Sequence, residues 1–134
     1  MRLRLAAACL VLLAPSSAFA AKQQEPGTNV DMPYLMAPVT MDGKLVAYAY
    51  ISSQIIAVSP NAAVEIRLKV PFIQDAFVRD VNARPVTRPD DPQTVDRDAL
   101  MARLLADARR AAGADKVAGI RFTQIQIAPL RPNP

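Results

Sequence analysis

Apolar residues occupy both of the alternating sets of positions along residues 44–59, a pattern that predicts a β-strand. One face of this segment is apolar and comprises Leu45, Ala47, Ala49, Ile51, Ile55 and Ala57. The other face is also largely apolar and comprises Val46, Tyr48, Tyr50, Ile56 and Val58. Two apolar faces indicate a central strand that is covered, at least in part, on both sides. Asp42-Gly43 precedes it as a hairpin turn, and residues 34–40 suit a proline-flanked edge strand.

Residues 59–81 fit two patterns. Ser59-Pro60 is a typical helix start, because a hydroxyl cap is followed by proline in the first turn. Alternation over residues 64–70 favours a strand instead. A longer stripe at steps of three and four favours a helix, and it comprises Ala63, Ile66, Val70, Ile73, Phe77 and Val81. We prefer the helix, since its stripe is longer and begins at a cap, and we expect Pro71 to kink it.

A proline-rich segment separates this helix from a second one. Residues 82–94 contain three prolines and two adjacent aspartates, which predicts a surface loop without regular structure. Asp96 can then cap a helix over residues 97–112, which carries a wide apolar stripe and ends at Gly113. This helix is the most clearly marked element of the chain.

The last predicted strand covers residues 116–127. Its apolar positions change parity, because Ile120 and Phe122 are even-numbered while Ile125 and Ile127 are odd-numbered. Such a change predicts a β-bulge near Thr123. Together the elements predict a small α/β domain of the α+β type, an antiparallel sheet packed against two helices, over residues 33–128. Residues 21–32 are expected to form a flexible lead-in, and residues 129–134 a disordered tail.

The first twenty residues have the anatomy of a secretory signal. Arg2 and Arg4 precede an apolar run over residues 5–13, and Ala18-Phe19-Ala20 is a small-x-small cleavage site. We expect cleavage before Ala21 and a periplasmic mature chain without a membrane span, because the run is shorter than the roughly twenty residues a span needs. The alternatives are an uncleaved anchor or a structural helix. Cys9 lacks the leucine that usually precedes a lipidated cysteine.

The composition excludes much catalytic chemistry. The chain has no histidine, and its one cysteine, Cys9, lies in the predicted signal. The commonest general base, nucleophilic pairs with histidine and most zinc sites are therefore absent. The mature chain keeps 14 basic and 12 acidic residues, interspersed, so neither nucleic acid nor anionic lipid is indicated as a long-range partner. No metal or cofactor is expected.

Two groups of residues remain as candidates for chemistry or contact. The carboxylates of Asp90-Asp91, Asp96 and Asp98 could bind a hard cation, but their spacing lacks the glycine and distal glutamate of a calcium loop. Tyr48 and Tyr50 share one face of the predicted central strand, and tyrosine is enriched at protein interfaces. Packing in the core, with the hydroxyl groups satisfied, is the alternative for both tyrosines.

The order of these elements resembles the flagellar basal-body-associated FliL family over residues 34–127. The family's first helix carries a Pro-x-Ile/Leu-Arg-Asp motif, and Pro71-Phe72-Ile73-Gln74-Asp75 matches it except at Gln74. Its last strand often reads Val-x-Phe-Thr-x-Phe/Ile-x-Ile/Val-Gln, and residues 120–127 are similar, with Ala128 in place of the final glutamine. The motifs make Pro71, Asp75, Phe122 and Thr123 candidate interaction or structural residues.

The resemblance implies a stomatin-like (SPFH) fold and a role without catalysis. Family members assemble in the periplasm around the stator of the flagellar motor, so it implies protein partners in the basal body, and self-association. Members usually have an N-terminal membrane-spanning helix, whereas this chain has a cleavable-looking signal, and the proline-rich segment 82–94 replaces a glycine-containing one. Both differences indicate a divergent, soluble member. The alternative is a periplasmic binding or envelope-associated module unrelated to flagella.

Overall fold

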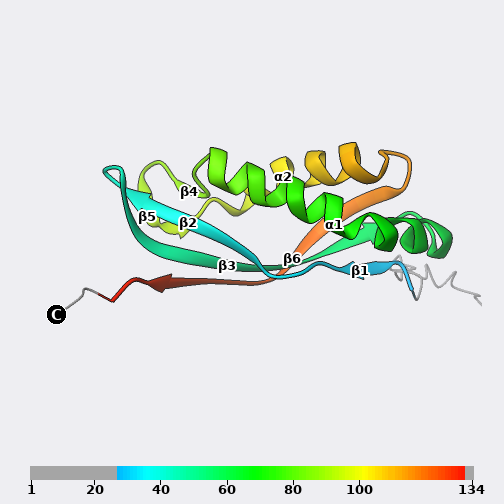
Figure 1. Cartoon of the computed structure of the whole chain (residues 1–134), viewed down its shortest axis with the longest axis horizontal. Helices are drawn as coiled ribbons and strands as arrows, with labels where there is room; N and C mark the ends of the chain where they lie inside the picture. Colours follow the sequence, from blue (N-terminus) through cyan, green and yellow to red (C-terminus); the bar gives the residue numbers. More distant parts are fainter. Residues whose placement is uncertain (1–26, 132–134) are drawn as a thin grey trace, which may run out of the picture.

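An antiparallel sheet carries two helices on one of its faces (Figure 1), in a computed structural model that describes residues 27–131. Its strands are β1 (Asn29–Asp31), β2 (Leu35–Met41), β3 (Lys44–Ala57) and β6 (Val117–Pro129). β1 and β2 pair in succession with one edge of β3, and β6 pairs with the other edge. Helix α1 (Pro60–Ala83) lies over β1 and β2, and helix α2 (Arg97–Ala112) over β6. The predicted α+β fold is confirmed. The predicted signal, residues 1–20, lies outside the described residues.

β3 is the central strand because both of its edges are paired. The turn before it is the predicted one: Asp42 and Gly43 both have positive φ, 51° and 76°, as a two-residue hairpin turn that follows strand twist requires. Only one face of β3 is covered, however. Its odd-numbered residues from Ala47 to Ala57 are buried under the helices, whereas Tyr48 and Ile56 are half-buried and Tyr50 is exposed. The expectation of cover on both faces is therefore wrong.

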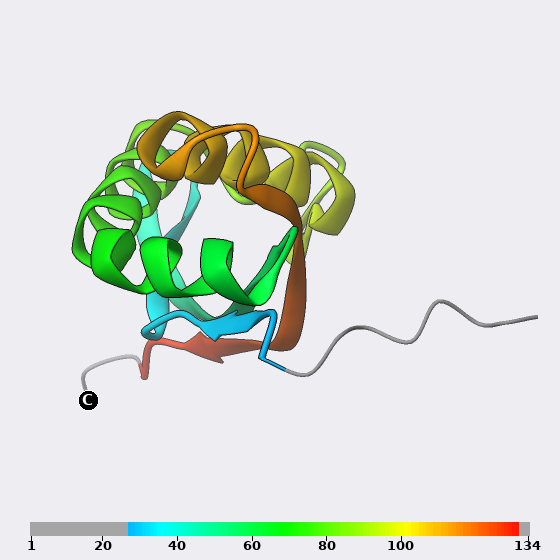
Figure 2. The ribbon, with the colours of Figure 1, turned by 90° about the vertical axis from the view of Figure 1, so that its right-hand side faces the viewer.

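Helix α1 begins as the sequence indicates. The Ser59 hydroxyl accepts a hydrogen bond from the Ala62 amide at 3.1 Å, and Pro60 occupies the first turn. Pro71 lies inside the helix without ending it, and the helix axis bends along its length (Figure 2). Proline explains such a bend, since it removes one helical hydrogen bond and crowds the preceding turn. The alternative strand over residues 64–70 is not formed.

Helix α2 has the predicted bounds, and arginine side chains connect it to β6. The Asp96 carboxylate caps its N-terminus through the Ala99 amide at 3.3 Å, and Gly113 ends it with a φ of 109°. Arg97 donates to the Phe122 carbonyl at 3.2 Å. Arg109 donates to the carbonyls of Val117 and Ala118, at 3.4 and 3.3 Å. These contacts hold α2 over the first half of β6.

The predicted bulge lies in β6 at Thr123. Ser53 pairs with Phe122 and Ser52 with Gln124, so Thr123 is the extra residue. Because one residue is inserted there, Ile125 and Ile127 return to the side of the sheet that Ile120 and Phe122 occupy. Both parity groups therefore face the helices; Ile120 and Phe122 are buried, and the two later isoleucines are partly buried.

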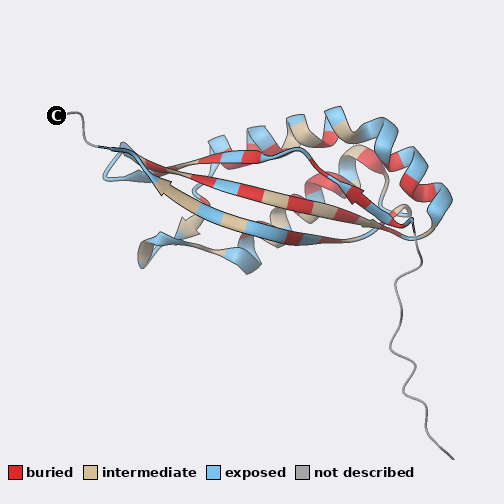
Figure 3. Cartoon of the chain, turned by 90° about the horizontal axis from the view of Figure 1, so that it is seen from below, coloured by how far each residue is buried: buried red, intermediate tan, exposed pale blue. Residues whose placement is uncertain are grey.

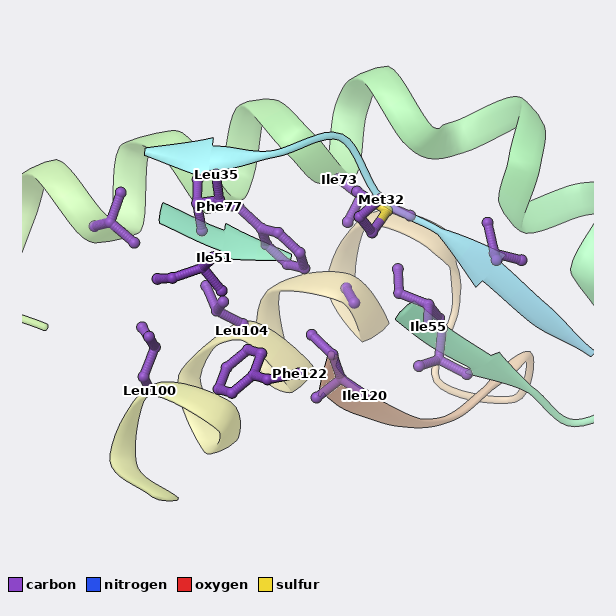
Figure 4. Packing of buried hydrophobic residues seen from close by; sticks show 14 of the residues in the cluster. Met32, Leu35, Ile51, Ile55, Ile73, Phe77, Leu100, Leu104, Ile120 and Phe122 are labelled. Carbon is purple, nitrogen blue, oxygen red and sulfur yellow. The ribbon is translucent and has the colours of Figure 1, made fainter. Parts of the chain in front are cut away.

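The core lies between the helices and the covered face of the sheet (Figure 4). Phe77 and Ile73 project from α1, and Leu104 and Leu100 from α2, with no exposed surface. They meet Met32, which lies between β1 and β2, and the strand side chains Leu35, Ile51, Ile55, Ile120 and Phe122. This packing supplies most of the apolar burial and therefore most of the favourable free energy of folding.

Three expectations about irregular segments need correction. In the expected lead-in, residues 29–31 form β1, where the pairing of backbone groups with β3 outweighs a polar sequence, and Val30 is buried. In the expected loop, β4 (Thr87–Arg88) and β5 (Asp91–Val95) form a short hairpin, since Pro92 can lie in a strand with a free edge. The expected tail is ordered at its start, where the Leu130 amide donates to Val46.

Candidate interaction surfaces

The open face of the sheet carries the two tyrosines that the sequence singled out. Tyr48 lies between Pro38 of β2 and Ala128 of β6, and Tyr50 lies between Met36 and Gln126. Tyr50 and Met36 are 39% and 50% exposed, and no helix lies over this face (Figure 3). Neither tyrosine belongs to the buried core. We call the side chains of Met36, Pro38, Tyr48, Tyr50 and Ala128 the tyrosine patch.

The other half of the open face is polar. Gln54 of β3 donates to Asp31 of β1 at 2.6 Å and accepts from Arg121 of β6. This network links β1, β3 and β6, and it provides hydrogen-bond partners for the side chains of Asp31, Gln54 and Arg121. The open face therefore has two halves. Covering the apolar half would be favourable, whereas the polar half already has its hydrogen bonds within the chain.

A second apolar surface lies on the outer side of α1. Val64, Leu68 and Phe72 are spaced by four residues, so they form one row on the helix. They are 55%, 74% and 64% exposed. The helix surface after Phe72 is polar, because Asp75 and Arg79 form an exposed ion pair there. We call Val64, Leu68 and Phe72 the α1 row.

A groove of about 490 Å³ runs between α1 and α2 and contains buried charge. Asp80 of α1 is almost fully buried and binds Arg103 at 2.7 Å and Arg84 at 3.1 Å. Asp107 of α2 is also buried and pairs with Arg110. The groove lining contains no serine, cysteine or histidine, so its chemistry is that of paired carboxylates and guanidinium groups.

Burial raises the pKa of the Asp107 carboxyl above its ordinary value. The hydrogen bond from Arg110 opposes this shift, and the nearby charge of Asp80 adds to it. Both carboxylates are thus held in a low-dielectric contact between the helices. The Asp80–Arg103 ion pair joins α1 to α2, whereas Asp107 and Arg110 pair within α2, so the buried charge gives the groove a structural role.

Three of the four carboxylates considered for cation binding are engaged locally. Asp90 binds Arg88 at 3.1 Å, and Asp96 caps α2. Asp91 accepts hydrogen bonds from the Thr94 hydroxyl and the Gln93 amide, and these bonds lower the pKa of Asp91. Within residues 27–131, no three histidine, cysteine or acidic side chains gather where they could hold a metal ion.

A further pocket, of about 310 Å³, lies where the sheet ends near the β4–β5 hairpin. Its lining is apolar except for Gln93, and comprises Val39, Met41, Val46, Ala47, Pro92, Ile127 and Pro129. The volume is at the lower limit of pockets that bind small molecules. One polar side chain gives little basis for orienting a ligand.

The candidate residues do not gather in one site. Phe122 is in the core, with the Arg97 guanidinium 5.7 Å from its ring centre, and Thr123 is exposed at the bulge. Pro71 and Asp75 are exposed on α1. Only Tyr48 and Tyr50 lie together. The α1 row is not among the residues expected from the sequence, although it forms a second row at steps of four, opposite the buried stripe.

Comparison with known proteins gives no family. No protein-family model matches the sequence, and no curated protein matches it. Neither helix in the described part of the chain, residues 27–131, has an apolar stretch of the length needed to cross a membrane.

Proposed function

We propose that this chain is a periplasmic protein-interaction domain of the FliL-like type, without catalytic activity, which associates with the flagellar basal body or stator. The observation that carries the proposal is the tyrosine patch. It joins two tyrosines and a methionine on a sheet face that no other element of the described chain covers. Tyrosine and methionine are both enriched in protein interfaces. Tyrosine combines a large apolar area with a polar hydroxyl, and methionine has a flexible side chain that adapts to a partner.

The flagellar part of the proposal rests on the motifs. The segment Pro71-Phe72-Ile73-Gln74-Asp75 lies in α1, and the segment over residues 120–127 lies in β6, on opposite sides of a shared core. Ile73 and Phe122 are buried there, which gives the apolar motif positions a packing role. Asp75 remains on the surface, so its carboxylate is accessible to a partner.

The test combines swimming with co-purification. Deletion of the gene should reduce swimming, and the tagged full-length chain should retain stator or basal-body proteins from its host. Tyr50→Ser should lose these partners. Tyr34→Ser is the matched control, because Tyr34 is 71% exposed but lies in the β1–β2 connection, beside Gln74. Normal swimming, together with purifications free of motor proteins, would refute the flagellar role.

The pocket beneath the β4–β5 hairpin favours a second candidate, a periplasmic module that binds a small apolar molecule. Native mass spectrometry of the chain purified from its host would detect such a ligand as added mass. Ala47→Leu should remove that mass, since Ala47 is buried in the pocket wall and a larger side chain would fill the space. If the unaltered chain purified from its host shows only the mass of the polypeptide, this candidate is excluded.

A further inference from the structure

The α1 row is an unusual surface for a water-exposed helix. Leu68, at 74%, is the most exposed large hydrophobic side chain among residues 27–131. The row lies on the side of α1 opposite Ile66 and Ile73, which are fully buried, so α1 has apolar residues on both sides of its first half. Of the row, only Phe72 lines the groove between α1 and α2. Val64 and Leu68 lie outside that groove and are exposed.

Two cations flank the row. Arg67 lies toward β1 and donates to the Asn29 carbonyl at 3.3 Å. Lys69 lies on the other side, with its amine 5.5 Å from the centre of the Phe72 ring. Within the described chain, neither forms an ion pair with a carboxylate, whereas the neighbouring Glu65 is paired with Lys116. The apolar row is thus bordered by positive charge on both sides.

We propose that the α1 row is a membrane-surface site, at which the first half of α1 lies on an anionic bilayer. An aromatic and aliphatic row bordered by lysine and arginine is the composition of helices that lie in the interface. The side chains of the row enter the boundary between headgroups and acyl chains, while Arg67 and Lys69 bind lipid phosphates. This site goes beyond the proposed protein partners and does not depend on them.

The chain path supports this occupant. The described chain begins at Gly27 and enters β1, whose Asn29 is bonded to Arg67 of α1. The chain therefore enters the domain beside Arg67, at one border of the α1 row, and the expected export signal directs that end of the chain to a membrane.

A second copy is a poorer occupant on charge grounds. If two copies of α1 packed antiparallel about Leu68, Val64 of one would meet Phe72 of the other. The same arrangement would place Arg67 beside Arg67 of the other copy on one flank and Lys69 beside Lys69 on the other, and like charges in these positions repel. An anionic surface instead complements both cations at once, through local contact and not through the near-neutral net charge of the chain.

The test uses the absence of tryptophan from the chain. Phe72→Trp places a single reporter in the row, and Met36→Trp places a control of similar exposure on the open sheet face. The vesicles contain phosphatidylglycerol and carry brominated acyl chains. On them the fluorescence of the Phe72→Trp variant should shift to the blue and be quenched, whereas that of the Met36→Trp variant should change little. Adding Arg67→Gln with Lys69→Gln should weaken the apparent vesicle affinity about thirtyfold.

Site-specific quenching keeps the test independent of residues 1–26. If that segment alone held the chain on vesicles, the reporter and control variants would be quenched to the same extent, and the proposal would be wrong. An unquenched reporter in Phe72→Trp at low salt would also overturn it, as would equal quenching on purely zwitterionic vesicles. A blue shift of that reporter in host extract without lipid would indicate an acidic helix of a protein partner instead. Each of these results leaves the motor co-purification experiment unaffected.

Discussion

Asp80→Asn is the substitution that best tests the contact between the helices. The Asp80 carboxylate is 4% exposed and holds two guanidinium groups, those of Arg103 and Arg84. One oxygen lies 2.8 Å from Arg103 Nε and 2.7 Å from its Nη2, and the other lies 3.1 Å from Arg84 Nη2. Asparagine keeps the volume but removes the charge and replaces one acceptor oxygen with a donor, so the change removes the ion pairs without leaving a cavity.

The expected loss of stability follows from how far each partner is buried. Arg84 is 61% exposed, so its pairing contributes at most about 1 kcal/mol. Arg103 is 18% exposed, and removing the partner of a buried charge costs roughly 3–5 kcal/mol. Two features reduce this loss, because Arg103 also bonds the Pro85 carbonyl at 3.0 Å and Asp107 loses a repulsive neighbour. We expect a loss of about 3 kcal/mol, lowering Tm by roughly 10–20 °C.

Urea unfolding at pH 7, followed by far-UV circular dichroism, measures this difference. Asp75→Asn is the matched control, since Asp75 lies on the same helix and forms an ion pair with Arg79 in which both side chains are more than half exposed. That control should lose less than about 0.5 kcal/mol. If the two variants differ by less than about 0.5 kcal/mol, which is the value of one exposed pair, the burial argument is wrong.

Two other substitutions test local features. Because burial raises the pKa of Asp107, the folded chain binds its proton more tightly than the unfolded chain does. The contribution of Asp107 to stability is therefore complete below the unfolded pKa of about 3.9 and is lost as pH rises through the folded pKa. Asp107→Asn should gain stability relative to the unaltered chain between pH 4 and pH 7 in urea titrations, and a constant difference would contradict this. Pro71→Ala should raise stability by about 2 kcal/mol, because it restores a hydrogen bond inside α1. A lower Tm in calorimetry would instead show that the bend is required for packing.

The elements with strong local signals were predictable. The Asp42-Gly43 turn and both helix starts depend on residue types whose conformational preferences act without tertiary help. The bulge at Thr123 could be predicted because the strand must keep its apolar side chains on one face. The sequence therefore determined the order of the main strands and helices closely.

The remaining features depend on tertiary context. β1 has three residues and one buried side chain, so its place in the sheet comes from backbone pairing with β3. The β4–β5 hairpin forms despite its prolines through two paired positions with an irregular register. The α1 row was missed because a helix with apolar residues on both sides gives no local indication of which side meets the core.

The bulge at Thr123 also affects how this chain can be compared with distant relatives. After the inserted residue, the apolar side chains of the strand fall on odd-numbered positions instead of even-numbered ones, although they still point to the same face of the sheet. A relative that lacks the extra residue would keep the same core with one residue fewer, so a single gap at position 123 would align both halves of β6. Alignments without that gap would match buried positions to exposed ones from residue 124 onward. Similarity in this strand is therefore best measured separately on each side of the bulge.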